Sequence, residues 1–223
     1  MKKILARGGV ELIAVVLGIT LSLWVDDKRE LNIIDKNNVK TLQSIKNEVR
    51  LRIDYIERKI NQYQRDIEVG EYVIKNWTDI DFDSITSKTK NDRSIVLTLK
   101  AYRAINLPIS IYNSLNSDGS IARLDQDSIK VILNNLYEVF PAHIIDGVEN
   151  ERVLYHSFNE FIINNYPRIV EDGVGELEKN DYKKFFNDDI VLGYVLEKTH
   201  IRRFILRLIT NYHNRLIHLE GML

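Results

Sequence analysis

The residues best suited to chemistry in this sequence are its histidines and glutamates at helical spacing. Glu197 and His200 form one E-x-x-H pair, a spacing that di-iron helical bundles use twice, together with two more glutamates. No second copy of the pair occurs. The other four histidines have only acids at ordinary surface frequency as neighbours at helical spacing. We therefore expect a capping or surface role for His200 rather than metal ligation.

Two acidic segments share some features with calcium-binding loops. Asp79, Asp81 and Asp83 alternate in a polar stretch, and residues 114–125 place Asn, Asp and Gly at spacings that an EF-hand loop uses. The first segment lacks further ligands and a glycine turn. The second has serine at its first ligand position and ends at Asp125, where glutamate is expected. These patterns predict a solvated loop and a helix-capping turn, respectively.

Linear catalytic motifs are absent. The sequence has no P-loop, no Rossmann glycine fingerprint, no G-x-S-x-G and no H-E-x-x-H. It also has no cysteine, which excludes disulfides, thiolate metal sites and thiol nucleophiles. The 31 basic and 32 acidic residues nearly balance and form no basic run, which argues against nucleic acid as a partner. We expect a non-enzymatic protein without a cofactor.

The element that must position everything else is an apolar stretch over residues 10–25. Extended back to residue 4 it spans 22 residues, and at about 1.5 Å per residue a helix of that length matches a bilayer core of about 30 Å. Lys2, Lys3 and Arg7 precede it, so the positive-inside rule keeps the N-terminus in the cytoplasm. We expect a single-pass membrane anchor, with the following helical domain outside the cytoplasm.

A cleaved signal peptide and a core helix of a soluble protein are the two rival interpretations of this stretch. No small-x-small cleavage site follows it, because it ends in the sequence LWVDD. Trp24 also suits an interfacial position in a membrane. The uncleaved anchor is the preferred interpretation, and the two rivals stay open at this point.

Small residues within the stretch predict association between membrane helices. Ala14, Gly18 and Ser22 recur every four residues, a spacing that lets helix backbones approach closely in lipid. Glu11 lies near the same face, and a carboxylate costs about 2.5 kcal/mol or more at the bilayer centre. Glu11 therefore either lines a shared polar seam or narrow pore, or pairs with Arg7 in the headgroup region.

The segment after the anchor predicts one long amphipathic helix. Residues 27–77 contain no proline and one glycine, Gly70, and their apolar residues follow a heptad spacing. Further apolar residues widen this face beyond the needs of a two-stranded coil, so we expect packing in a bundle, directly continuous with the anchor. The seam predicted to face the bundle is Ile53, Ile56, Ile60, Tyr63, Ile67 and Ile74.

The remaining sequence predicts helices and no strand. Asp125 or Asp127 is expected to cap a helix that ends at Pro141, and Gly119 to adopt a left-handed conformation after an earlier helix. The last helix carries four arginines that we place mainly on its wet face: Arg202, Arg203, Arg207 and Arg215. The expected helical ranges after the long helix are 94–105, 109–115, 125–140, 142–165 and 188–219.

The fold class is therefore all-α. Residues 1–27 are predicted to form a transmembrane anchor, and residues 28–223 a helical bundle domain of about five or six helices.

The N-terminal sequence resembles a family of uncharacterised bacterial membrane proteins. Its members begin with a Glu-led apolar segment of the type E-I-x-L-V-V-x-G-I-x-I-A-L and continue into helices. Residues 111–121, IYNSLNSDGSI, look like the family's aromatic-x-x-L-x-S-x-G turn, although residues 24–27 depart from its common Asn-Asn-Trp. The resemblance implies a helical protein anchored in a bacterial inner membrane and brings no activity. The matching N-terminal residues are Glu11, Val15, Val16, Gly18, Ile19 and Leu21.

The leading functional hypothesis is a membrane-anchored scaffold or sensor that self-associates and engages a protein partner. The alternative is an oligomeric membrane effector whose N-terminal helices form a pore or disrupt the bilayer. A hydrolase or metal enzyme is a third hypothesis, which predicts bound metal or turnover. The expected partners are thus the lipid bilayer, further copies of the chain and another protein, but no nucleic acid.

Overall fold

The computed structural model describes residues 2–81, 95–171 and 179–223, with side chains described for 16–81, 95–170 and 182–223. No strand occurs in this part of the chain, and the prediction of an all-helical bundle of about six helices is confirmed. The elements are α1 (Lys2–Lys75), α3 (Ile95–Lys100), α4 (Ser110–Ser117), α5 (Asp127–Asn134), a π-helical turn η1 (Asn135–Val139), α6 (Phe140–Asn165), a 3₁₀ turn η2 (Pro167–Glu171), α7 (Lys179–Phe185) and α8 (Asp189–Met222).

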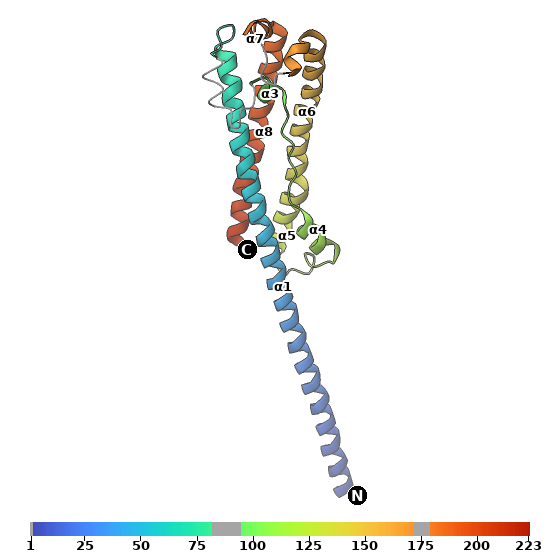
Figure 1. Cartoon of the computed structure of the whole chain (residues 1–223). Coiled ribbons are helices and arrows are strands. Elements are labelled where there is room, and N and C mark those ends of the chain that lie inside the picture. The colour runs from blue at the N-terminus through green and yellow to red at the C-terminus, as the bar shows by residue number, and fades with distance from the viewer. Residues whose placement is uncertain (1, 82–94, 172–178) are drawn as a thin grey trace.

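Three long helices, α1, α6 and α8, lie side by side and form the bundle (Figure 1). α8 runs antiparallel to the other two and contacts both, most extensively α1. The short helices α4 and α5 lie at the lower end of the bundle, and α3 and α7 lie at the upper end. The N-terminal part of α1 extends from the lower end as a single rod.

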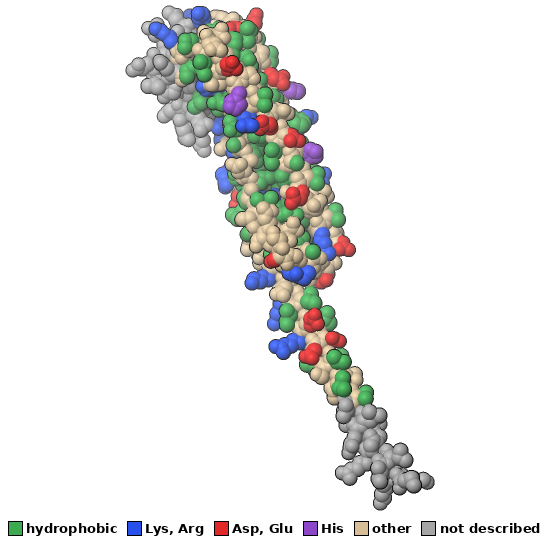
Figure 2. All heavy atoms as spheres, turned by 90° about the vertical axis from the view of Figure 1, so that its right-hand side faces the viewer, with side chains coloured by type: hydrophobic (Ala, Val, Ile, Leu, Met, Phe, Trp, Pro, Cys, Tyr) green, Lys and Arg blue, Asp and Glu red, His purple; other side chains and the backbone are tan. Residues whose placement is uncertain are grey.

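Helix α1 is one unbroken helix of 74 residues, which corresponds to about 110 Å at 1.5 Å per residue. The prediction that the long amphipathic helix continues directly from the apolar stretch is therefore confirmed. The space-filling view shows the same change from bundle to rod along the molecule (Figure 2). From residue 16 to Lys40 nearly every side chain of α1 is exposed, whereas Thr41 and Ile45 are already buried in the bundle.

Among the residues that the structure describes, no helix combines the length and the apolar character of a membrane span. The side chains of residues 1–15 lie outside the described part. Lys2, Lys3, Arg7, Glu11 and Ala14, named above for topology and helix association, are among them.

Two apolar clusters fill the bundle. The lower one joins α1, α5, α6 and α8, and the upper one is rich in aromatic rings from α6, α7 and α8, such as Phe158 stacked on Tyr194. Of the seam positions on α1, Ile56 and Tyr63 are fully buried and Ile67 is 7% exposed. Ile53, Ile60 and Ile74 are partly buried at the edges of these clusters.

Gly70 lies where α1 packs closely against α8. A Cβ atom at this position would overlap the Thr199 hydroxyl of α8. The absence of a side chain therefore allows this approach.

The expectation that Pro141 ends a helix is wrong, because α5 passes through η1 into α6 without a break. In η1 the N–H of Phe140 donates to the carbonyl of Asn135, five residues back. In that register Pro141 would donate to Leu136, but proline has no N–H. The Leu136 carbonyl instead accepts from Arg52 Nη1 at 3.1 Å and from the Tyr212 hydroxyl at 2.9 Å. Side chains from two other helices thus accommodate the proline.

The predicted cap of α5 is also wrong. Its N-cap residue is Gln126, which makes no capping side-chain bond. The Asp125 carboxylate accepts from Asn38 Nδ2 at 2.9 Å, and Asp127 pairs with Lys130 at 3.0 Å. Long-range contact with α1 has therefore replaced the local cap at Asp125. The left-handed conformation expected at the end of α4 is confirmed, with φ +75° at Gly119.

Candidate functional site

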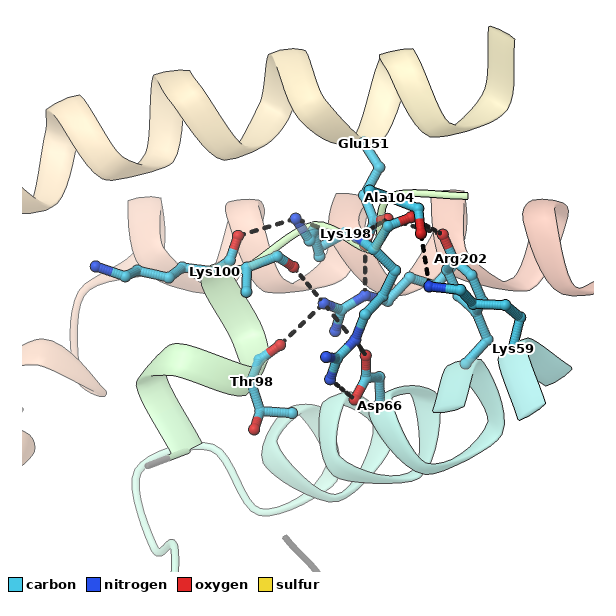
Figure 3. Close-up of polar contacts among 11 residues, drawn as sticks. Lys59, Asp66, Thr98, Lys100, Ala104, Glu151, Lys198 and Arg202 are labelled. Carbon is cyan, nitrogen blue, oxygen red and sulfur yellow. Dashed lines mark hydrogen bonds and ion pairs between the residues drawn. The ribbon is translucent and has the colours of Figure 1, made fainter. Parts of the chain in front are cut away.

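The helix predicted over residues 94–105 ends at Lys100, and residues 101–109 have no regular structure. The prediction fails here because side chains of α8 donate to the carbonyls of Thr98, Lys100 and Ala101, which a continuing helix would use. Figure 3 shows these bonds converging on the segment. Arg202 Nη2 donates to Thr98 at 2.9 Å and Ala101 at 2.7 Å, Lys198 Nζ donates to Lys100 at 3.0 Å, and Lys59 Nζ donates to Ala104 at 2.6 Å.

Glu151 of α6 is the centre of this arrangement. Its Oε1 accepts from Arg202 Nε at 2.7 Å and lies 3.6 Å from Lys198 Nζ. Its Oε2 accepts from the Tyr63 hydroxyl at 3.1 Å and from the backbone N–H of Arg103 at 3.2 Å. The side chains of Glu151, Arg202 and Lys198 are 0%, 1% and 2% exposed, so these charges lie out of contact with solvent.

Asp66 of α1 supplies the second carboxylate. Arg103 binds it through two hydrogen bonds, Nε to Oδ2 at 2.6 Å and Nη2 to Oδ1 at 2.7 Å. This paired geometry is the strongest that arginine makes with a carboxylate. Arg202 Nη2 lies 3.7 Å from the same Oδ2. We call Asp66, Arg103, Glu151, Lys198 and Arg202 the charge network; it joins α1, α6, α8 and the segment after α3.

The charge network holds three cationic side chains against two carboxylates. A buried charge without its own partner is costly, and Lys198 has the weakest pairing, since its nearest carboxylate oxygen already accepts from Arg202. Burial lowers the pKa of Lys198 to about 7, against the opposing pull of Glu151. With Lys198 neutral, two cations face two anions and the network is balanced.

The pKa shifts of neighbouring groups preserve this balance of charge. The hydrogen bond to Asp66 raises the pKa of Arg103, which stays charged. Burial and the Glu151 carboxylate raise the pKa of Tyr63, which stays neutral and can donate to Glu151. Burial, followed by repulsion from Arg103, lowers the pKa of Lys59 at the edge of the network. Burial thus brings the pKa of Lys198 close to neutrality, and we expect Lys198 to lose its proton near pH 7.

A second buried polar group lies lower in the bundle. Glu48 of α1 accepts from the backbone N–H groups of Ile111 at 2.6 Å and Tyr112 at 3.1 Å, and so caps α4 from another helix. Arg52, one turn along α1, donates to the carbonyls of Pro108 and Leu136 and to the Tyr212 hydroxyl. Its guanidinium lies 3.7 Å from the centre of the Tyr137 ring. We call Glu48, Arg52, Tyr137 and Tyr212 the arginine–tyrosine cluster.

Two surface hollows lie in the described part of the chain. Their lining includes no member of the charge network or of the arginine–tyrosine cluster. No group of three or more metal-ligand side chains occurs among the described residues, and Glu197 and His200 are exposed. The charge network joins α1, α6, α8 and the segment after α3 through buried contacts, an arrangement suited to coupling these helices.

The sequence-derived site residues are brought together only in part. Gly18 and Ser22 lie exposed on the rod, and Tyr63 is the seam residue that joins the charge network. The placement of Arg202 on the wet face is wrong, since it is fully buried, while Arg203, Arg207 and Arg215 are exposed.

A sequence signal for the buried cations was present but was missed. Apolar residues recur along α8 at alternating spacings of three and four, and Lys198 and Arg202 occupy two positions in that register. Arg52 interrupts the buried stripe of α1 in the same way, between Val49 and Ile56. A charge inside an otherwise unbroken apolar stripe is thus the pattern to look for.

No family model matches this chain, and no curated protein or solved structure matches it either. Function is therefore inferred from the chain's own residues.

Proposed function

We propose that this chain is a non-enzymatic, single-pass membrane protein whose helical bundle serves as a scaffold or sensor outside the cytoplasm. In this proposal the bundle self-associates and engages a protein partner. The observation that carries it is the continuity of α1, which extends without interruption from the apolar stretch into the core of the bundle.

The exposed apolar side chains of the rod support attachment to a bilayer. Val16, Leu17, Ile19, Leu21, Leu23, Trp24 and Val25 are each between 53% and 59% exposed. Apolar surface exposed to water is less favourable than apolar surface buried in lipid by about 25 cal/mol per Å². Lys28 Nζ lies 4.2 Å from the centre of the Trp24 ring, and this pair of residue types suits the interface at the end of a membrane helix.

The buried groups on α1 support a sensing role. Glu48, Arg52, Tyr63 and Asp66 lie on the same helix as the rod, with no loop between them. A shift or rotation of the anchor would therefore move both the arginine–tyrosine cluster and the charge network. The two groups hold α4, η1 and the segment after α3, so displacement of the anchor has a direct mechanical route into the bundle.

The small residues on the rod support self-association. A Cβ atom added at Gly18 would meet nothing within 4 Å, and Ser22 is exposed one turn further along. This face is therefore free to approach another membrane helix.

Disulfide crosslinking in native membranes tests the proposal, because the chain contains no cysteine of its own. Gly18→Cys and Ser22→Cys should form crosslinked dimers on oxidation. Thr20→Cys, about 200° around the helix from Gly18, should form far fewer. Monomers for all three variants, or equal crosslinking of all three, would contradict the proposed association.

Glu11→Ala separates this proposal from an oligomeric membrane effector. A scaffold should retain membrane attachment and show only a shift in crosslinked fraction. An effector that conducts through a polar seam should lose conductance or toxicity, because the variant removes the carboxylate from the apolar stretch.

A further inference from the structure

The helices α1 and α8 form a groove on the outside of the bundle, separate from the buried groups. It has a volume of about 740 Å³ and extends along α8 from His200 to Asn211. These residues cover about three helical turns, or about 17 Å. A groove of this length matches the apolar face of one helix of similar length, which is a common mode of peptide recognition.

Apolar side chains from both helices contribute to the floor of the groove. Ile67 of α1 is nearly buried, Leu206 of α8 is partly buried, and Phe204 is 42% exposed. Because Phe204 is so exposed, a partner that covered its ring would gain favourable free energy from burying apolar surface. Aromatic residues and arginines are also the residue types that contribute most at protein interfaces.

The rim of the groove carries excess positive charge. Arg203 donates to Glu71 Oε1 at 2.7 Å through Nη2 and at 3.1 Å through Nε. Arg207 lies one turn further on, with its guanidinium 5.7 Å from the centre of the Phe204 ring. Two guanidinium groups thus face one carboxylate, and this excess favours a partner with acidic side chains.

We propose that this groove binds an amphipathic helix of a partner protein, with apolar anchors on one face and acidic residues flanking them. The inference rests on the proposed scaffold function, for which it names the docking surface and the chemistry of the partner. Phe204 and Ile67 receive the apolar anchors, and Arg203 and Arg207 pair with the acidic flanks.

A pair of synthetic helical peptides tests this surface on the full chain in lipid nanodiscs. One fluorescent peptide of about four turns carries Leu at i, i+4, i+7 and i+11 with Glu at the flanking positions, and its match carries Lys in place of each Glu. We expect the Glu peptide to bind at least about tenfold more tightly than the Lys peptide, a difference of about 1.4 kcal/mol. Nanodiscs without the protein serve as the control for binding of the peptides to lipid alone.

Two variants of the groove sharpen the test. Phe204→Ala should weaken binding of the Glu peptide about tenfold or more. Arg203→Glu combined with Arg207→Glu should reverse the preference toward the Lys peptide. Arg152→Glu, at an exposed position of α6, should change neither affinity.

Equal binding of the two peptides, or an affinity that Phe204→Ala leaves unchanged, would overturn the inference. Loss of self-association in Phe204→Ala would also overturn it, because a second copy would then occupy the groove. Crosslinking through Gly18→Cys does not involve this surface. Failure of the peptides with crosslinking intact therefore defeats the docking site alone, whereas failure of crosslinking defeats the proposed self-association.

Discussion

The charge network and the arginine–tyrosine cluster both bind backbone carbonyls that lack a helical partner, but they differ in the balance of positive and negative charge. Each satisfies carbonyls with buried cationic side chains where the chain leaves regular α-helix. Arg202 and Lys198 bind the carbonyls of residues 98–101 in the network, and Arg52 binds those of Pro108 and Leu136 in the cluster. The cluster contains one guanidinium, that of Arg52, and one carboxylate, that of Glu48. The network holds three cations and two carboxylates.

This difference separates a fixed element from a titratable one. In the cluster, aromatic rings and hydroxyls surround Arg52. In the network, the excess charge falls on Lys198, whose pKa burial lowers to about 7. We therefore expect the lower end of the bundle to be insensitive to moderate pH changes and the upper end to respond to them.

The largest expected effect is the loss of the central carboxylate of the network. Glu151→Gln removes the carboxylate nearest to both Arg202 and Lys198, so Arg202 keeps only its 3.7 Å contact with Asp66. This loss should lower the free energy of unfolding by about 3–5 kcal/mol. Thermal and denaturant unfolding of the full chain in detergent, followed by circular dichroism, measures it. Glu149→Gln, at an exposed position two residues earlier on α6, should cost far less, because surface ion pairs contribute little to stability. Equal costs for the two variants would contradict the account.

Removal of the guanidinium from the lower cluster should have the next largest effect. Arg52→Met leaves the Pro108 and Leu136 carbonyls without this donor, at an expected cost of about 2–3 kcal/mol. The same unfolding experiment measures it, with Arg50→Met as the control because Arg50 forms an exposed pair with Glu220. Unlike Glu151→Gln, the Arg52 variant should show a cost that varies little with pH near neutrality.

The pH dependence of stability should depend on Lys198. Between about pH 7 and the ordinary lysine pKa of 10.5, the unfolded chain binds one more proton at this site than the folded chain. The free energy of unfolding should therefore rise with pH in this window, by up to about 1.4 kcal/mol per pH unit. Unfolding at several pH values between about 7 and 9.5, below the ionisation of most tyrosines, measures the slope.

Lys198→Met should remove the larger part of that slope, with a smaller part left to Lys59, whose pKa is also lowered. The exposed Lys75→Met variant should keep the full slope. An unchanged slope in Lys198→Met would show that Lys198 does not carry the excess charge.

The smallest expected effect is the loss of the cap that α1 provides to α4. Glu48→Gln keeps an oxygen for one of the two N–H groups but loses its charge, so about 1 kcal/mol of stability should be lost. Hydrogen exchange at Ile111 and Tyr112 should increase more than exchange in α8. An equal increase in hydrogen exchange at both places would show that Glu48 does not act through the cap of α4.

Periodicity predicted the long elements well because burial of one helix face determines them. The range expected for the last helix, 188–219, lies close to α8, and 142–165 lies close to α6. The end of α3 and the passage through Pro141 could not be predicted from local signals. Side chains distant in sequence, Arg202 and Arg52 among them, supply the hydrogen bonds that decide both. The buried charges of the candidate site arise from the same long-range contacts.

Membrane fractionation of the full-length chain tests the central claim most directly. The account predicts that the chain stays with the bilayer through an alkaline carbonate wash, floats with lipid in a density gradient and enters solution only with detergent. A chain that is recovered as a soluble species without detergent, with the apolar stretch folded against its own bundle, would contradict it.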